Sequence, residues 1–402
     1  MRVQRLIFGV SFAAALYGQG SYVIESIAPP AGFATATATS INQNGLVTGY
    51  YTTAPDANGN STSRPFLYDA NSCSLLSLQT INGSSTTAAA VDNAGLVIGT
   101  TLMGTGQTAV PRAFASWRGF ATDLGGSLHL RAFAMNNSGT VVGSQTPGGQ
   151  LTEGAVFWTT CLDCVSTKTF PFTLEPIVPS GPFNFPVVTV NPPSGTSPVN
   201  EATAINDSGL VAGWLRANGQ TWGLALLPGA SSWTRISPVP ASVTVPGLEL
   251  STVPKAINRN GNIAGVAGGG LGSGTHAFFS RNYLLPAIDL GTLNPTDPNT
   301  ISLAEGINAN DWVVGTSTVN TTDFPHAFLH NGTTMIDLNT RVGGGQGWLL
   351  TVANSINDSG WIVGMGIHNN RQEGFVLVPE ILNHALNPCT VVVSVPFNGA
   401  PL

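Results

Sequence analysis

Charged residues are scarce in this sequence: they make up 8% of its 402 residues, while 42% are hydrophobic. A chain that stays disordered needs the opposite balance, so we expect a folded protein. The 14 Lys and Arg residues are outnumbered by 20 Asp and Glu, a net charge of −6, which argues against a nucleic-acid partner because such partners need a basic surface. An apolar run of about 20 residues is also lacking, so we expect no membrane span. Gly (48 residues), Thr, Ser, Asn and Val abound while strong helix formers are few, and this composition predicts an all-β protein.

The first 20 residues have the pattern of a secretory signal peptide. Arg2 and Arg5 precede an apolar stretch at residues 6–16, and the small residues Gly18 and Gly20 follow, where a signal peptidase could cleave. The less favoured alternative is a buried N-terminal strand or helix. We therefore predict that residues 1–20 are a signal peptide and that the protein is secreted, to the extracellular space or the cell surface.

Four cysteines are present: Cys73, Cys161, Cys164 and Cys389. The C-x-x-C spacing of Cys161 and Cys164 also occurs in redox motifs and as half of a zinc site. A second C-x-x-C or a nearby His cluster is missing, and the pair lies in a Pro-rich segment rather than at a helix start. A local disulfide between Cys161 and Cys164 is therefore favoured, which leaves Cys73 and Cys389 as the other intrachain pair. We predict no metal and no cofactor.

One motif, small-x-small-Ile-Asn-x-x-Gly-x-Val-x-Gly, recurs along the whole chain. Successive copies are 44 to 52 residues apart, except for one interval of 70 (206 − 136), which indicates an insertion at about 161–198, where Pro and Ser cluster. The copies indicate one structural unit repeated seven times. The Asn position of the motif is occupied by Asn42, Asp92, Asn136, Asn206, Asn258, Asn308 and Asn357.

The motif predicts two β-strands joined by a tight turn. Three residues after the Asn, six copies have Gly and one has Asp311, and both residue types tolerate the positive φ of a hairpin turn. A β-branched residue follows two positions later, and another glycine two positions after that. A glycine inside a strand lowers stability, so its recurrence predicts a β-bulge or a close backbone approach. These glycines are Gly49, Gly99, Gly143, Gly213, Gly265, Gly315 and Gly364.

The strand before the turn alternates small residues with Ile-type residues, as at Ala38, Ser40 and Ile41 in the first copy. A strand that needs small side chains in every copy is expected at the crowded hub of a ring. After the hairpin each copy supplies two further strand-like runs. The first of these carries a large apolar residue: Phe66, Phe114, Phe157, Leu224, Phe278, Phe328 or Phe375.

Four strands per unit and a period of about 50 residues predict a β-propeller. The last copy ends at its third strand, whereas an unpaired strand at residues 22–27 precedes the first copy. We therefore predict an all-β fold: one seven-bladed β-propeller of four-stranded blades over residues 21–380, closed by the N-terminal strand, which removes both open edges. Residues 381–402 are predicted to form a C-terminal tail.

The repeats resemble a family of bacterial exported proteins, the HAF-type probable extracellular repeats. The name-giving tripeptide occurs at residues 276–278 and 326–328, with Arg112 in place of the His in an earlier copy, and the family's Asp-Leu-Gly segment occurs at 123–125 and 289–291. The resemblance covers nearly the whole chain after residue 20. It implies export and a repeated β architecture, and it brings no established reaction or catalytic residue.

One position varies while its neighbours stay constant. It lies three residues before the motif Asn and becomes polar in consecutive copies, at Lys255, Glu305 and Asn354. With Thr203 and with Glu201, two residues earlier, these side chains could ring one mouth of the channel and bind a small polar ligand. The alternative, which we favour, is an ion pair between Lys255 and Glu305 that serves the fold alone. The seven occupants of the position are Thr39, Ala89, Phe133, Thr203, Lys255, Glu305 and Asn354.

Two further features have a functional and a structural interpretation. His276 and His326 occupy equivalent positions in adjacent copies, where a shared metal site is conceivable, but other copies lack a ligand there and hydrogen-bonded histidines that cap a blade are favoured. Trp312 and Trp361 could stack on sugar rings, yet tryptophan more often fills gaps between blades.

The sequence as a whole predicts a secreted, non-catalytic binding or scaffold protein that is monomeric. Its expected partner is a carbohydrate, the cell envelope or another extracellular protein. No Ser/His/Asp order, phosphate-binding loop or paired carboxylate motif rises above chance, so no catalytic residue is predicted. The alternative is a secreted propeller glycoside hydrolase or polysaccharide lyase that uses Glu201, Lys255 and Glu305.

Overall fold

The computed structural model describes residues 21–380 except for 77, 105–108, 118–119, 125–128, 147–153, 160–173, 177–182, 185–188, 191–198, 218–219, 229, 231–232, 238–250, 269–273, 321 and 344–346. The predicted signal peptide, the predicted tail and Cys161 and Cys164 lie outside the described residues, as does most of the predicted insertion at 161–198. Those interpretations therefore stay predictions. Cys73, in the turn before β5 (Ser74–Leu76), is disulfide-bonded, and Cys389 also lies outside the described residues.

The strands of the described residues form seven antiparallel sheets of four strands each, numbered here in the order of their first strands. Sheets 1 to 4 contain β2 (Thr35–Ile41), β3 (Leu46–Thr52), β4 (Ser63–Asp69) and β5; β6 (Ser85–Val91), β7 (Val97–Met103), β8 (Val110–Trp117) and β9 (Phe120–Asp123); β10 (His129–Met135), β11 (Thr140–Thr146), β12 (Gly154–Thr159) and β13 (Leu174–Pro176); and β16 (Val199–Ile205), β17 (Val211–Ala217), β18 (Gln220–Leu226) and β19 (Thr234–Arg235).

Sheets 5 to 7 contain β20 (Ser251–Ile257), β21 (Ile263–Gly268), β22 (His276–Ser280) and β23 (Ile288–Asp289); β24 (Ser302–Ile307), β25 (Val313–Ser317), β26 (His326–His330) and β27 (Met335–Asp337); and β28 (Trp348–Ile356), β29 (Ile362–His368), β30 (Arg371–Pro379) and β1 (Tyr22–Ile27). A two-stranded sheet of β14 (Phe183–Asn184) and β15 (Thr189–Val190) and a 3-10 helix, η3 (Leu338–Thr340), complete the elements of the described residues.

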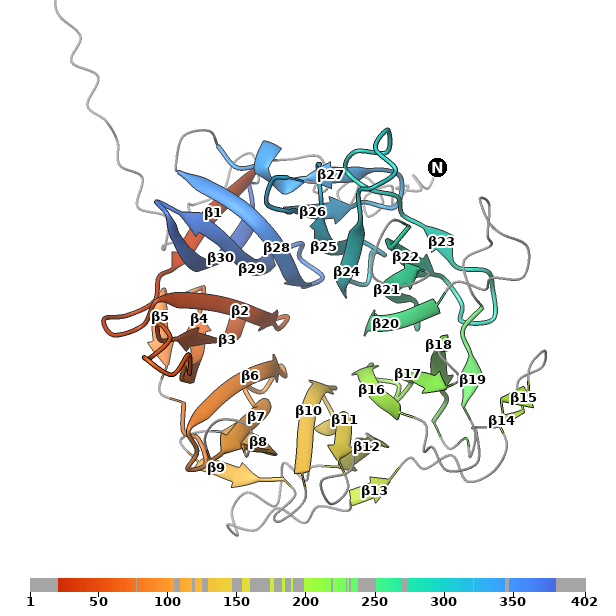
Figure 1. The fold of residues 1–402 in the computed structure, drawn as a ribbon, viewed down its shortest axis with the longest axis horizontal. Coiled ribbons are helices and arrows are strands. Elements are labelled where there is room, and N and C mark those ends of the chain that lie inside the picture. Colours follow the sequence, from red (N-terminus) through yellow and green to blue (C-terminus); the bar gives the residue numbers. More distant parts are fainter. Residues whose placement is uncertain are drawn as a thin grey trace, which may run out of the picture.

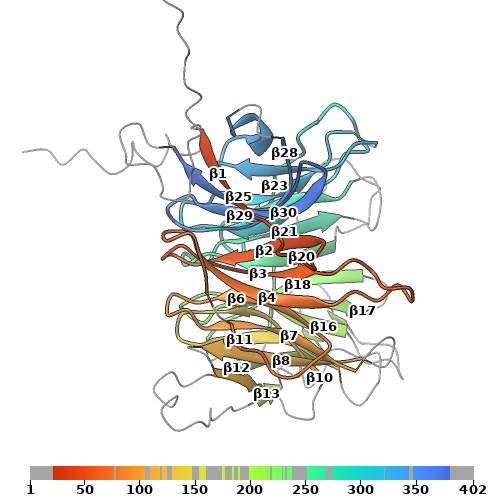
Figure 2. The ribbon, with the colours of Figure 1, turned by 90° about the vertical axis from the view of Figure 1, so that its left-hand side faces the viewer.

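The sheets stand around a common axis, with the first strand of each sheet innermost (Figure 1). Neighbouring inner strands contact one another in chain order from β2 to β28, and β28 in turn contacts β2. Figure 2 shows the same arrangement from the side. The prediction of an all-β propeller with four-stranded antiparallel blades is confirmed.

The N-terminal strand β1 completes the last sheet. It pairs antiparallel with β30, from Tyr22 opposite Pro379 to Ile27 opposite Gly374, and in Figure 1 the red β1 lies beside the blue β30. The strand predicted at residues 22–27 therefore pairs with the last strand of the described chain and completes the sheet formed by β28, β29 and β30. The pairing covers the edge of β30, which would otherwise present unsatisfied backbone groups.

Every inner strand carries a β-bulge at the same place. In sheet 1, Ala38 pairs with Gly49 and Ser40 pairs with Thr48, so that Thr39 is left as the extra residue. The same register shift occurs in all seven sheets. The extra residues are Thr39, Ala89, Phe133, Thr203, Lys255, Glu305 and Asn354, the variable position of the sequence motif.

The recurring motif glycine is required by this bulge. A Cβ atom on Gly49 would overlap the carbonyl oxygen of Thr37, and the equivalent overlap with an inner-strand carbonyl occurs at each of the other six motif glycines. On its other side, Gly49 pairs with Phe66 of the third strand, and the motif glycine faces the predicted large apolar residue in six of the seven sheets. In sheet 3, Gly143 pairs with Val156 and the predicted Phe157 pairs with Val142. The prediction of a bulge with close backbone approach is confirmed.

The turn between the first two strands also matches its prediction. The turn glycines, such as Gly45, have φ between +79° and +86°, and Asp311 takes their place with φ +63°. Side chains of the third strands fill the space between sheets, since Phe66, Phe114, Phe278, Phe328 and Phe375 are almost completely buried.

We predict that Gly315→Ala lowers the free energy of unfolding by about 3 kcal/mol or more, because the added methyl group meets the Leu303 carbonyl, a backbone group that cannot move away cheaply. Urea unfolding measures this change. Gly343→Ala is the matched control, since a Cβ there has no neighbour within 4 Å. Equal stability of the two variants would contradict the role assigned to the bulge.

Candidate functional site

An axial channel of about 450 Å³ runs between the seven inner strands. Each strand contributes its bulge residue and the residues that follow, so the channel wall repeats the same stretch of the motif around the axis. All seven bulge residues line it. A bulge re-aims a side chain out of the regular alternation of a strand. The fold therefore brings together the residues that differ most among the repeats.

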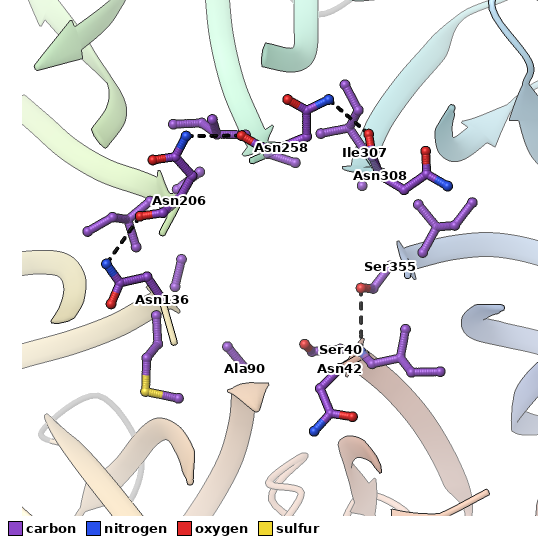
Figure 3. Close-up of a pocket in the computed structure, with 18 of the residues that line it drawn as sticks. Ser40, Asn42, Ala90, Asn136, Asn206, Asn258, Ile307, Asn308 and Ser355 are labelled. Atoms are coloured by element: carbon purple, nitrogen blue, oxygen red, sulfur yellow. Dashed lines mark hydrogen bonds between the residues drawn. The ribbon is translucent and has the colours of Figure 1, made fainter. Parts of the chain in front are cut away.

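The motif asparagines form a ring of hydrogen bonds around the channel. Figure 3 shows the links from Asn136 to Asn206 and from Asn206 to Asn258. Within its own turn the Asn side-chain oxygen accepts backbone N–H groups; that of Asn206, for example, accepts from Ser208 and Leu210 at 3.1 and 3.0 Å. Its Nδ2 donates to the backbone carbonyl of the counterpart in the next sheet, at 2.7–3.2 Å in six of the seven junctions. The sixth link joins Asn357 to Asn42 and so connects the last sheet to the first.

A second set of hydrogen bonds links the residues that follow the motif Asn. In five of the seven junctions the backbone N–H of this residue donates to the side-chain oxygen of its counterpart in the next sheet, at 2.8–3.0 Å. The series is interrupted where the counterpart is Arg259 or Ala309, which have no side-chain oxygen. The Arg259 guanidinium instead lies 3.2 Å from the carboxylate of Asp358, two sheets further on.

Asp92 is the exception in the ring of asparagines. Its Oδ1 accepts the N–H groups of Ala94 and Leu96, as the other copies do, but its Oδ2 is buried and has no hydrogen-bond partner. In the other sheets this position carries the NH₂ group that bonds the next sheet, here Asn136. Burial raises the pKa of the Asp92 carboxyl, and the hydrogen bonds from Leu96 and Ala94 oppose this only in part. A protonated Oδ2 would supply the missing donor.

Three bulge side chains connect neighbouring sheets. Thr39 donates to the carbonyl of Ala88 at 3.0 Å, and Thr203 donates to that of Pro254 at 2.8 Å. The Nδ2 of Asn354 donates to the carbonyl of Ala38, also at 2.8 Å. The hydroxyls of Thr39 and Thr203 therefore donate hydrogen bonds to backbone carbonyls, whereas the side-chain oxygen of Asn354 has no hydrogen-bond partner among the described residues.

Lys255 and Glu305 lie side by side on the same wall of the channel. The Lys255 Nζ is 4.0 Å from the Glu305 Oε2, and the side chains are 39% and 28% exposed. Burial raises the pKa of Glu305, and the charge of Lys255 works in the opposite direction. The predicted contact between these two residues of adjacent sheets is present, at a distance longer than a hydrogen bond.

The structure does not bring Glu201 to this ring. It is absent from the residues that line the channel; its cross-strand neighbour is Trp214, whose indole N–H donates to the Glu201 carboxylate at 3.1 Å. The expectation that Glu201 joins the mouth assumed that two positions on one face of the strand share one environment. In the structure, Glu201 instead binds the adjacent strand β17, because Trp214 places a hydrogen-bond donor directly opposite it.

The two histidines of the HAF tripeptide are paired with aspartates rather than with each other. His276 Nδ1 lies 2.9 Å from Asp289, and His326 Nδ1 lies 2.7 Å from Asp337; the hydrogen bond to Asp289 raises the pKa of His276. Arg112 makes the equivalent contact with Asp123 at 2.8 Å. Among the described residues no group of three or more His, Cys, Asp or Glu side chains could hold a metal ion. These contacts agree with the capping interpretation.

The tryptophans after the turn fill space between sheets. Trp312 is only 5% exposed and packs against Gly360 of the next turn, and Trp361 packs in the same way against Gly45. Trp312 therefore offers no open ring face for sugar stacking, and Trp361 is partly buried. In the part of the chain that is described, no helix has the length and apolar character needed to cross a bilayer.

Comparison with known proteins finds likeness of fold alone. No family model and no curated protein matches the chain. Among solved structures it is similar to an acylaminoacyl peptidase of Pyrococcus horikoshii (9% identity, TM-score 0.48, covering 86% of this chain and 51% of that one) and to a puromycin-hydrolyzing peptidase of Mycobacterium tuberculosis (10%, 0.47, 87% and 62%). It is also similar to the sialidase of Trypanosoma rangeli (10%, 0.39, 88% and 56%). The chain thus matches about half to three fifths of the length of these proteins.

We predict that Asp92→Asn raises the free energy of unfolding by about 1–3 kcal/mol at pH 7, because the new NH₂ group satisfies the Asn136 carbonyl. The gain should depend on pH. Since the folded protein holds the Asp92 proton more tightly than the unfolded chain, the native protein loses stability as pH rises above the ordinary aspartate pKa of about 3.9 and through the raised value. The advantage of the variant should therefore shrink toward pH 4, as urea unfolding across this range would measure.

The reverse substitution is the matched control. Asn206→Asp removes the Nδ2 that donates to Asn258 at 3.0 Å and should cost about 1–3 kcal/mol at pH 7. If both substitutions change stability in the same direction, the ring of asparagine hydrogen bonds does not have the role given to it here.

Proposed function

We propose that this protein is a secreted, non-catalytic binding or scaffold protein of the extracellular space or cell surface, and that its ligand site is the mouth of the axial channel. The proposed ligand-binding residues are Thr203, Lys255, Glu305 and Asn354. The observation that carries the proposal is the ring of bulges: the scaffold is constant in all seven sheets, and the side chains that the bulges turn into the channel are the ones that vary.

The proposal includes the finer architecture and family. We infer a seven-bladed ring of HAF-type repeats from a bacterial exported protein, with the N-terminal strand as its closure. The contact of His276 with Asp289 and the equivalent contact of Arg112 with Asp123 support the repeat assignment, since these aspartates begin the two Asp-Leu-Gly segments and the contacts give both halves of the signature one structural role. A monomer is expected, because a propeller leaves only short sheet edges exposed, such as the two-residue strands β19 and β23.

A catalytic alternative has weaker support. A propeller glycoside hydrolase or polysaccharide lyase would use Glu201, Lys255 and Glu305, and hydrolysis of a glycosidic bond generally needs two carboxyl groups facing one substrate. Glu201 accepts a hydrogen bond from Trp214 and does not line the channel, so Glu305 is the single carboxylate of the bulge ring. Asp92, Asp207 and Asp358 also line the channel, but their oxygens accept backbone N–H groups of the turns and junctions. This arrangement favours binding.

The proposal is tested with the purified mature protein on a glycan array, alongside digestion assays with the same polysaccharides. We expect saturable binding without turnover, and a loss of at least tenfold in affinity for Lys255→Met and for Glu305→Gln. Glu201→Gln, outside the channel, is the matched control and should bind like the native protein. Turnover abolished by Glu305→Gln would establish the enzymatic alternative. Binding that none of the channel variants alters would place the ligand elsewhere.

A further inference from the structure

Lys255 and Glu305, the two charged bulge residues of the channel, have no hydrogen-bond partner among the described residues. Their separation of 4.0 Å between Nζ and Oε2 exceeds the range of about 2.7–3.2 Å for a hydrogen bond between such groups, and the structure gives neither group another hydrogen-bond partner among the described residues. The Glu305 side chain is partly withdrawn from water, whereas that of Lys255 is more exposed. A charge in such a position is costly unless a partner replaces the lost hydration.

At the bulge position, the opposite wall of the channel is apolar. In the cyclic order of inner strands, Lys255, Glu305 and Asn354 belong to sheets 5, 6 and 7, and the sheets across the axis contribute Ala89 and the half-buried Phe133. Thr39 and Thr203, between the two arcs, bond backbone carbonyls. The cross-section thus has one side with a positive and a negative group next to each other and one side with an aromatic ring.

We infer that the channel binds a small zwitterion, an α-amino acid with an apolar side chain. This inference rests on the proposed function, because it takes the channel mouth as the ligand site. The ligand carboxylate would accept from the Lys255 ammonium, and its ammonium would donate to the Glu305 carboxylate and to the Asn354 Oδ1. The apolar side chain would cross the axis to Phe133.

Charge balance favours this class over others. A ligand with a single charge would hydrogen-bond one of the two charged groups and leave the second without a charged partner of its own, whereas a zwitterion offers an acceptor to Lys255 and a donor to Glu305. The opposite charges of an amino acid sit on one carbon, which matches two side chains that are themselves adjacent. The channel, at about 450 Å³, lies within the range of about 300–1,000 Å³ of small-molecule sites.

The inference is tested by calorimetric titration of the mature protein with L-phenylalanine and with two blocked analogues. N-acetyl-L-phenylalanine lacks the ammonium, and L-phenylalaninamide lacks the carboxylate. We expect L-phenylalanine to bind at least tenfold more tightly than either analogue. Lys255→Met should weaken binding of L-phenylalanine at least tenfold but leave binding of L-phenylalaninamide unchanged. Glu305→Gln should weaken binding of L-phenylalanine at least tenfold but leave binding of N-acetyl-L-phenylalanine unchanged. Phe133→Ala should weaken the binding of L-phenylalanine more than the binding of glycine.

Glu201→Gln is the matched control, and thermal unfolding shows whether each variant is folded. Equal affinity for L-phenylalanine and its blocked analogues would overturn the inference. So would the absence of saturable binding to both L-phenylalanine and L-leucine. If a glycan nevertheless binds in a manner that depends on Lys255 and Glu305, the inference fails and the proposed function stands; if no ligand depends on either residue, both fail.

Discussion

The contact between each motif glycine and an inner-strand carbonyl oxygen determines the shape of this protein. It permits a bulge at one point of every inner strand, and the bulge turns an extra side chain toward the axis. A methyl group at that glycine would push the strands apart at the most crowded part of the molecule. In six of the seven sheets the same glycine also faces the large apolar residue of the third strand, so the position of the bulge and the packing of the core are coupled.

The asparagine ring solves a second problem, which is how wedge-shaped sheets stay together at a narrow hub. One side chain satisfies its own turn through Oδ1 and bonds the next sheet through Nδ2, so the formation of each turn prepares the contact with its neighbour. Amide and carboxyl groups are nearly the same size, but a carboxylate cannot donate. Asp92 therefore accepts the hydrogen bonds of its own turn but, unless it is protonated, cannot donate one to the next sheet. The junction between sheets 2 and 3 differs from the other six for this reason alone.

The repeat made the architecture predictable from sequence, because each motif position has one physical role in every copy. The spacing identified the strands, the strand at residues 22–27 and its partner, and the variable position that proved to be the bulge. The fate of individual side chains was less accessible. Glu201 lies on the expected strand, yet its surroundings depend on Trp214 in the paired strand. For Asp92, the sequence showed only an Asp where the other copies have Asn. That its Oδ2 is buried without a partner could not be predicted, since this burial depends on the closed ring.

A ring of near-identical units can recognise an asymmetric ligand only where the units differ. Along the channel the small, Ile-type and Asn positions are nearly constant, so two positions remain. The residues after the motif Asn are largely engaged in capping the N–H groups of their neighbours, and Arg259 is paired with Asp358. At the bulge position Thr39 and Thr203 are also engaged. Among the described residues, the polar groups of the bulge ring that lack a hydrogen-bond partner are thus those of Lys255, Glu305 and the oxygen of Asn354. Their location on three consecutive sheets gives the channel a direction that a ring of identical sheets would lack.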